Sequence, residues 1–154
     1  MIELVRLTTE NTIILDDLAE LNRQFAIEDG QQTPSEPFCD YIVARLDDEA
    51  MFVTLAVENG TPIGYILVFD VITHPFIPDW HRSGYITQMF VHADHRRKGI
   101  GRKLVDDGLA WLTVRGVSQV MLNVHVVNPN GQQFWQSMGF VPHLSRKIRK
   151  LAAG

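Results

Sequence analysis

The chain of 154 residues contains a single cysteine, Cys39. One cysteine cannot form an intramolecular disulfide, and it cannot supply the several thiolates of a structural zinc or iron–sulfur site. The sequence also lacks any run of the roughly 18 apolar residues that a membrane span requires, and its first residues do not resemble a secretory signal. These absences predict a protein of the reducing cytoplasm, without a membrane partner.

Glycine and proline are not abundant, and no Gly/Ser-rich linker, internal repeat or low-complexity segment divides the chain. Apolar residues make up 45% of the sequence and charged residues 21%, which is typical of a globular protein. Because domains cluster near ~100–150 residues, we expect one domain over residues 1–154.

Charge is distributed unevenly along the chain. Residues 1–70 carry 14 acidic and three basic side chains, whereas residues 71–154 carry four acidic and 11 basic ones. Local fields steer ligands more than net charge does, so the acidic half suits a cationic substrate and the basic half an anionic cofactor. Acidic surface that is merely solvated is the alternative. The net charge of −4 and the lack of a recognition helix or an aromatic stacking platform argue against a nucleic-acid partner.

Hydrophobic periodicity predicts strands and helices in an α/β or α+β arrangement. Asn59-Gly60 predicts a tight antiparallel hairpin between two apolar runs. Asn128-Pro129 opens a helix that Gly139 ends. The predicted strands cover 2–7, 51–58, 62–72, 84–91, 118–126 and a stretch from 140 toward 148, and the other helices cover about 10–27, a short stretch ending near 48, and about 99–115. We expect parallel pairing between the strands around residues 88 and 122.

The segment from Arg96 to Lys103, with the sequence RRKGIGRK, lies between a predicted strand and a predicted helix. The first turn of a helix has unpaired N–H groups and partial positive charge, so it binds anions. A dinucleotide fingerprint is excluded because Leu104 stands at the third glycine position and residues 117–127 contain no acid. A P-loop is excluded because the Lys-Ser/Thr pair is absent. The pattern that remains is R-x-x-G-x-G.

This pattern resembles the acyl-CoA pyrophosphate loop of the GNAT superfamily of N-acetyltransferases. The preceding strand YITQMFV (85–91) and the later spacing of Asn128, Trp135 and Gly139-Phe140 are similar to that family as well, so the resemblance spans residues 50–141. It implies a mixed central sheet of six to seven strands, flanked by about four helices and splayed between the strands near 84–91 and 118–126.

The same resemblance implies transfer of an acetyl group from acetyl-CoA, as cosubstrate, directly to a primary amine of a small molecule or peptide. A non-catalytic acyl-CoA-binding sensor is the alternative. Members of the family are often dimers, which makes a homodimer a further expectation. The histidines lack the spacing of a metal site, so we expect no metal.

Carried over by position, the resemblance assigns roles to particular residues. Backbone groups of residues 89–91 would pair with the pantetheine arm of CoA, and one of their N–H groups would polarise the thioester carbonyl, which makes Met89 a catalytic candidate. The cofactor-binding candidates are Met89, Phe90, Val91, Arg96, Arg97, Lys98, Gly99, Ile100, Gly101, Arg102, Asn128 and Trp135.

The sequence departs from the family at its acid and base positions. Trp135 stands where many relatives carry a tyrosine that protonates the departing sulfur, and an indole N–H is not a useful acid. Thr87 and Asn123 stand where relatives often carry carboxylate bases, and neither titrates. The candidates for the base are therefore His125, His81, Tyr85, Glu28, Asp29 and bulk water, with His125 and Tyr85 as catalytic candidates beside Met89.

The acceptor amine would face the first two helices and the loop before the strand at 84–91, because family members build acceptor specificity there. The substrate-binding candidates are Glu28, Asp29 and Trp80.

Overall fold

The computed structural model describes residues 1–11, 15–28, 35–71 and 82–152. By its internal contacts the chain divides into two compact units, Met1–Leu122 and Asn123–Gly154. The expectation of one domain over the whole chain stays a prediction. Part of the predicted first helix and most of the loop expected before the strand at 84–91 lie outside the described ranges.

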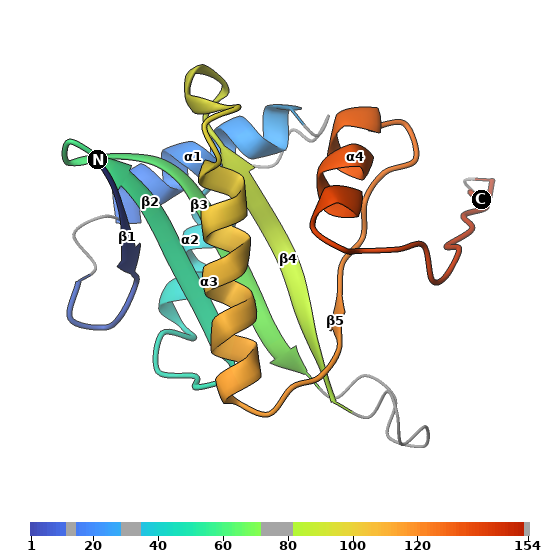
Figure 1. Ribbon diagram of the computed structural model, residues 1–154, viewed down its shortest axis with the longest axis horizontal. Helices are drawn as coiled ribbons and strands as arrows, with labels where there is room; N and C mark the ends of the chain where they lie inside the picture. The colour runs from blue at the N-terminus through green and yellow to red at the C-terminus, as the bar shows by residue number, and fades with distance from the viewer. Residues whose placement is uncertain (12–14, 29–34, 72–81, 153–154) are drawn as a thin grey trace. The chain divides into compact units, whose positions relative to one another are not determined.

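The first unit is built on a sheet with strand order β1-β2-β3-β4-β5 (Figure 1). The strands are β1 (Ile2–Arg6), β2 (Met51–Glu58), β3 (Thr61–Val71), β4 (Ser83–Val91) and β5 (Val120–Met121). Consecutive strands from β1 to β4 pair antiparallel, and β5 pairs parallel with β4. The predicted mixed α/β sheet is confirmed, with five strands in the described residues where six to seven were expected.

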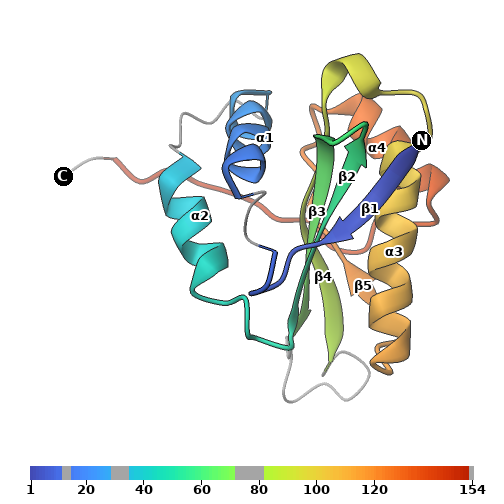
Figure 2. The ribbon, with the colours of Figure 1, turned by 90° about the vertical axis from the view of Figure 1, so that its left-hand side faces the viewer.

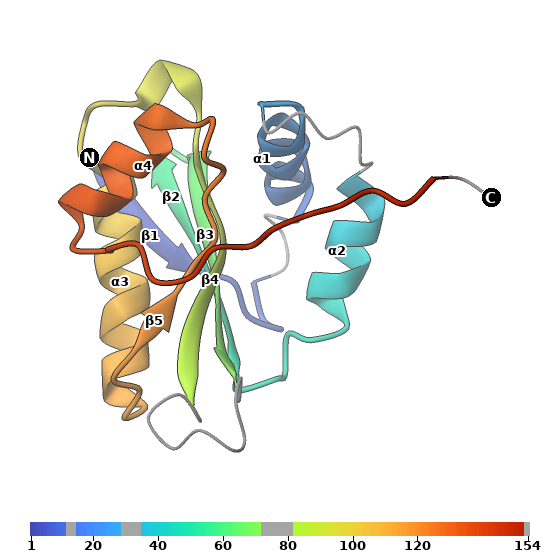
Figure 3. The ribbon, with the colours of Figure 1, turned by 90° about the vertical axis from the view of Figure 1, so that its right-hand side faces the viewer.

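Helices cover both faces of this sheet. α1 (Leu15–Glu28) and α2 (Ser35–Val43) lie against one face, and α3 (Ile100–Val114) lies against the other (Figure 2, Figure 3). The central strands are therefore buried on both sides, which explains why residues 51–57 and 63–68 form nearly continuous apolar runs.

The two faces use alternate residues of β2. Val53 and Leu55 belong to the core cluster that includes Leu18 of α1 and Ile42 of α2. On the other face α3 approaches closely at Gly108, where an added Cβ would lie 3.1 Å from Val68 Cγ2. An alanine here would therefore fit only if Val68 gave way by a few tenths of an ångström.

The turn between β2 and β3 has the geometry that its sequence predicts. Asn59 has φ 51° and Gly60 has φ 80°. A type I′ turn requires positive φ at both central residues, and this turn matches the twist of the strands that it joins. The predicted antiparallel hairpin is confirmed by the pairing of Glu58 with Thr61.

A cluster of charges connects three elements at the end of β3. Both oxygens of Asp70 accept hydrogen bonds from Arg82, which precedes β4, at 3.0 and 2.5 Å. Arg115, the C-cap of α3, donates its Nε to Asp70 at 3.0 Å. The Asp70 side chain is 6% exposed, and these bonds, Arg82 first, hold the pKa of its carboxyl below the usual value. This cluster fixes the end of the sheet from which β4 starts.

Two of the predicted strands differ from the structure: one is much shorter than expected, and the other does not form. The strand expected over 118–126 is reduced to the two residues of β5, which pair with Gly84 and Tyr85 only. Alternating apolar residues favour a strand, but a strand also needs a partner strand for its backbone hydrogen bonds. In the described residues, β4 provides such pairing only at Gly84 and Tyr85. Residues 140–148 form no strand, because Pro142 lacks an N–H and the cations around Ile148 leave no apolar face to bury.

The second unit contains α4 (Pro129–Ser137). The Asn128 side chain accepts a hydrogen bond from Gly131 N at 3.0 Å, and Pro129 occupies the first turn. The helix ends in a Schellman motif at Gly139, φ 90°, in which Phe140 N donates to Trp135 O at 3.0 Å. The predicted start and end of this helix are confirmed.

Within the described residues, no helix has both the length and the apolar character needed to cross a membrane.

Candidate acyl-CoA site

Strand β4 contains an irregularity in its middle. Leu67 of β3 pairs with Gln88, whereas the next residue, Val68, pairs with Ile86. Thr87 is therefore an extra residue, a β-bulge, and it is exposed. Bulges bend a strand and often occur next to active sites. Beyond the bulge, in the part of residues 1–122 that the structure describes, β4 pairs with β3 alone, so the β5-facing backbone of its second half has no strand partner there.

The end of β4 also approaches β3 closely. Gly64 pairs with Val91, and a Cβ added at Gly64 would lie 2.7 Å from the Phe90 carbonyl oxygen. Real Cβ contacts are essentially never that short, so any side chain here would displace the backbone of β4. The absence of a side chain at Gly64 thus allows the backbone of Phe90 and Val91 to lie where it does, just before the loop that follows β4.

That loop connects β4 to α3 and contains two residues with positive φ. After a short 3-10 turn (Ala93–His95), Arg97 has φ 65° and Gly99 has φ 77°. Among the residues that the structure describes, no backbone hydrogen bond uses the N–H groups of residues 97–102, and the first bond into the helix runs from Lys103 N to Gly99 O at 3.1 Å. Consecutive unpaired N–H groups at a helix N-terminus form a site for anions.

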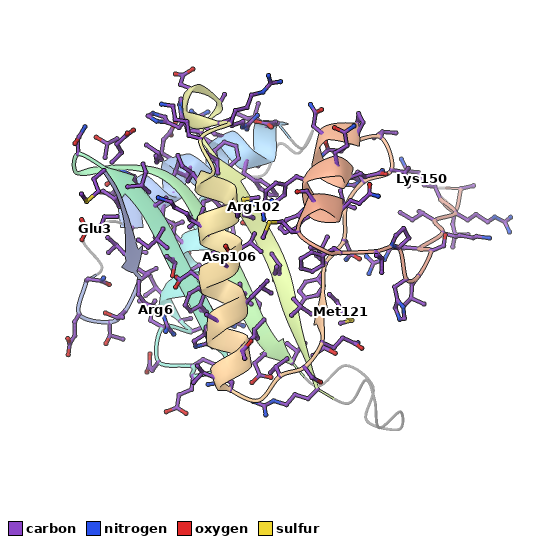
Figure 4. All side chains as sticks on the ribbon, in the orientation of Figure 1. Glu3, Arg6, Arg102, Asp106, Met121 and Lys150 are labelled. Carbon is purple, nitrogen blue, oxygen red and sulfur yellow. The ribbon has the colours of Figure 1, made fainter. Side chains whose placement is uncertain are left out.

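The cations of this loop have two different roles. Arg97, Lys98 and Arg102 are exposed, and Figure 4 shows Arg102 near the start of α3. Arg96 is committed within the protein: its Nε donates to Val91 O at 2.9 Å, and its Nη2 lies 2.6 Å from Glu28 at the end of α1. Three cations and six N–H groups are therefore available to an anion, while Arg96 ties the loop to β4 and α1.

Beneath the bulge lies a buried polar network that the periodicity did not predict. Tyr65 donates its hydroxyl to Gln88 Oε1 at 2.7 Å, and Asn22 Nδ2 donates to the same oxygen at 3.0 Å and to Tyr65 Oη at 3.1 Å. Tyr65 is completely buried, and this burial raises the pKa of its phenol well above the usual value. The sequence did carry one signal: Asn22 interrupts the apolar face of α1.

Comparison with known proteins decides the family. The model of the acetyltransferase (GNAT) family matches residues 15–140, which is most of the chain. The chain belongs to the GNAT acetyltransferase family. Membership makes it an acyltransferase, and the resemblance inferred from the R-x-x-G-x-G loop is confirmed.

Among curated proteins, this GNAT acetyltransferase is similar to N-alpha-acetyltransferase 30 of Schizosaccharomyces pombe, with 26% identity over 115 residues, 71% of each chain. Two other curated acetyltransferases match over 22% and 36% of their own length.

Solved GNAT structures share the fold. The aminoglycoside N-acetyltransferase AAC(6')-Iy in complex with CoA superposes with a TM-score of 0.84 at 15% identity, covering 99% of this chain and 96% of that chain. A ribosomal-protein-alanine N-acetyltransferase from Brucella melitensis biovar Abortus superposes with a TM-score of 0.73 at 22% identity, covering 98% and 100%.

The first unit of the GNAT chain brings together most of the predicted cofactor-binding residues. Met89, Phe90 and Val91 form the end of β4, and residues 96–102 follow directly in the loop and the first turn of α3. Tyr85 lies in β4 before the bulge, where it pairs with Phe69 and Met121. The functional roles assigned to these residues stay predictions.

The second unit contains three further candidates: His125 for catalysis, and Asn128 and Trp135 for cofactor binding. The Asn128 side chain caps α4, and the Trp135 ring packs edge-on against Phe134 and Phe140, with centroids 4.9 and 5.4 Å apart. Within this unit, Asn128 therefore caps a helix and Trp135 packs between two aromatic rings, and their roles in cofactor binding stay predictions.

The predicted acceptor residues are only partly described. Glu28 is exposed at the end of α1 and is engaged by Arg96. Asp29, Trp80 and the base candidate His81 lie outside the described residues. In the ranges that the structure describes, no three His, Cys, Asp or Glu side chains gather as a metal site would require.

Proposed function

We propose that the chain transfers an acetyl group from acetyl-CoA directly to the primary amine of a small molecule or peptide. The observation that carries this proposal is the run of unpaired backbone N–H groups over residues 97–102, flanked by exposed cations. These donors fit the CoA diphosphate, since several N–H groups and a helix N-terminus favour a doubly charged anion. The structure of AAC(6')-Iy, which was solved in complex with CoA, supports the same ligand.

The second half of β4 would bind the pantetheine arm. Its backbone toward β5 has no strand partner among the described residues of the first unit, so its N–H and C=O groups suit the amides of an extended ligand. One N–H of residues 89–91 would donate to the thioester carbonyl oxygen as negative charge develops on it. A single donor of this kind is worth about 2.7–4 kcal/mol of transition-state stabilisation.

The reaction then needs little further chemistry from the side chains. The neutral amine attacks the carbonyl carbon, a tetrahedral intermediate forms, and the C–S bond breaks to release CoA. A thiol has a pKa near ~8.5, so a thiolate can leave without an acid at Trp135. The base that removes a proton from the amine is one of the candidates named from the sequence: His125, His81, Tyr85, Glu28, Asp29 or bulk water.

The acceptor class follows from charge. The N-terminal half has a large excess of acidic residues, which favours a cationic amine over a neutral one. The relatives are named for α-amines and for aminoglycosides, and amines of both kinds are protonated in water. We infer a cytoplasmic location from the lone cysteine and from the proposed use of acetyl-CoA.

The test compares the thermal stability of the wild type and Gly101→Glu with and without acetyl-CoA. A ligand at about 100 times its Kd adds roughly 2.7 kcal/mol, which corresponds to a rise in Tm of about 5–10 °C. The new carboxylate should block the diphosphate site by charge, yet it lies in the first helical turn, where acids are stabilising, so the variant should fold.

Ala110→Glu is the matched control, because it adds the same side chain to an exposed position of the same helix. A rise in Tm for the wild type and Ala110→Glu, but not for Gly101→Glu, supports the site. Release of CoA thiol with a panel of polyamines, aminoglycosides, amino acids and peptides then identifies the acceptor. No rise in folded wild type refutes the cofactor site, whereas a rise without thiol release would favour an acyl-CoA sensor.

A further inference from the structure

The buried network of Asn22, Tyr65 and Gln88 has no part in the chemistry proposed above. Its members come from α1, β3 and β4, and the three hydrogen bonds join residues far apart in the sequence. Asn22 is 6% exposed and Tyr65 is fully buried. Buried polar groups cost free energy unless they form hydrogen bonds. The three groups bond to one another only when α1, β3 and β4 are in this arrangement, so the network favours it.

The network lies directly at the bulge. Gln88 is the first residue after Thr87, and its pairing with Leu67 places its side chain on the sheet face that α1 covers. Tyr65 pairs with Phe90, two residues further along β4, so Tyr65, Gln88 and Phe90 share that face. Met89, the first of the three residues that could supply the proposed oxyanion donor, lies between Gln88 and Phe90 in the chain.

The hydrogen bonds also penalise the alternative register. If β4 continued without a bulge, Thr87 would pair with Leu67 and Gln88 with Ile66. The Gln88 side chain would then turn to the α3 face, because a one-residue slip reverses every side chain. Asn22 and the Tyr65 hydroxyl would lose their shared acceptor in a buried site. The network therefore stabilises the bulged register against the regular one.

We propose that Asn22, Tyr65 and Gln88 are positioning residues that hold the β4 bulge and thereby aim the backbone N–H groups after it at the thioester carbonyl. The proposal rests on the proposed function, since it assigns a cause to the geometry of that oxyanion donor. Small misplacements of such donors weaken transition-state binding while ground-state binding persists. Loss of the network should therefore lower kcat more than it raises KM.

Tyr65→Phe tests this with minimal disturbance, because it removes only the hydroxyl. Thr54→Val is the matched control: it also removes a buried hydroxyl, from the neighbouring strand β2, and the Thr54 Oγ1 has no hydrogen-bond partner among the described residues. Its neighbours Val53 and Leu55 face α1, so Thr54 faces the other side of the sheet. We expect kcat to fall about 10-fold in Tyr65→Phe with KM for acetyl-CoA within about two-fold, and to stay unchanged in Thr54→Val.

Coupling distinguishes a network from a loss of stability. With Gln88→Ala already present, Tyr65→Phe should lower kcat by less than about two-fold more, because the shared acceptor is gone. Gln88→Glu keeps an oxygen for both donors and should retain more activity than Gln88→Ala. Independent, multiplicative effects of Tyr65→Phe and Gln88→Ala on kcat would overturn the proposal, as would an unchanged kcat in Tyr65→Phe.

Amide hydrogen exchange over residues 86–91 provides a readout that needs no turnover. Exchange should accelerate there in Tyr65→Phe and not in Thr54→Val, and equal exchange in both would refute the role of the network at the bulge. If the wild type binds acetyl-CoA but releases no thiol with any amine, the proposed function fails and the catalytic part of this proposal fails with it. The exchange result still decides whether the network holds the bulge.

Discussion

Replacing Asp70 by asparagine should markedly lower the Tm of the protein. Asp70 is the shared partner of Arg82 and Arg115, and its side chain is 6% exposed. Asparagine has nearly the same shape, so the substitution leaves packing intact and removes the negative charge. One of the two carboxylate oxygens also becomes an NH2 group, which faces a guanidinium that has only donors.

The size of the effect follows from the geometry. Hydrogen bonds to charged groups contribute about 1.5–3 kcal/mol each, and breaking a buried ion pair by removing one partner costs about 3–5 kcal/mol. The two arginines are partly exposed and can regain water, which lowers the cost. We expect a loss of about 2–3 kcal/mol, or roughly 4–12 °C in Tm for a chain of this length. Asp106→Asn, an exposed position on α3, should change stability by less than about 0.5 kcal/mol.

The pH dependence checks the cause. The pKa of Asp70 is lowered in the folded state, chiefly by its hydrogen bonds to Arg82, so its ionised form contributes stability above the unfolded pKa near ~3.9. That contribution is lost as pH falls through the lowered pKa. Urea unfolding should therefore give a constant difference between wild type and Asp70→Asn from pH 5 to 8, and a smaller one below about pH 4. A variant as stable as the wild type at pH 7, or a difference that persists in acid, would refute this reasoning.

Two further substitutions probe the candidate site. Gly64→Ala places a Cβ against the backbone of Phe90, so it should destabilise the protein by about 1–3 kcal/mol in urea unfolding and raise KM for acetyl-CoA; normal values for both would show that β4 can shift freely. Glu28→Gln removes an exposed partner of Arg96, so stability should fall by no more than about 1 kcal/mol while the acceptor KM rises; an unchanged acceptor KM would remove Glu28 from the acceptor site.

Local signals in the sequence predicted much of this fold. Asn59-Gly60 predicted the hairpin because two consecutive residues with positive φ are favourable in few other settings. Asn128 and Gly139 predicted both ends of α4 because the cap and the Schellman motif involve neighbours only. The loop glycine at residue 99 likewise has the positive φ that an R-x-x-G-x-G turn into a helix needs.

The failures arose where structure depends on partners distant in sequence. The alternation over 118–126 is compatible with a strand of nine residues, but pairing stops after Tyr85–Met121. The bulge at Thr87 is a property of two strands together, so no pattern in YITQMFV alone reveals it. The network of Asn22, Tyr65 and Gln88 needs three elements to be assembled before its chemistry is visible. Arg96 matches the family pattern for a phosphate contact, and that role stays a prediction; its bonds to Val91 and Glu28 join segments that the sequence pattern does not connect.

The candidate site arises because, in the described residues, backbone N–H groups lack hydrogen-bond partners where β4 ends and α3 begins. A sheet leaves such groups when a strand loses its neighbour, and a helix leaves them in its first turn. In this chain the bulge, the close approach at Gly64 and the positive φ of Arg97 and Gly99 bring the two kinds of group together along one continuous stretch, residues 86–102. Unpaired donors persist in folded proteins only where water or a ligand can satisfy them. A ligand that carries amides at one end and a diphosphate at the other would satisfy both sets. We therefore expect the backbone of this stretch, more than any side chain in it, to determine what the protein binds.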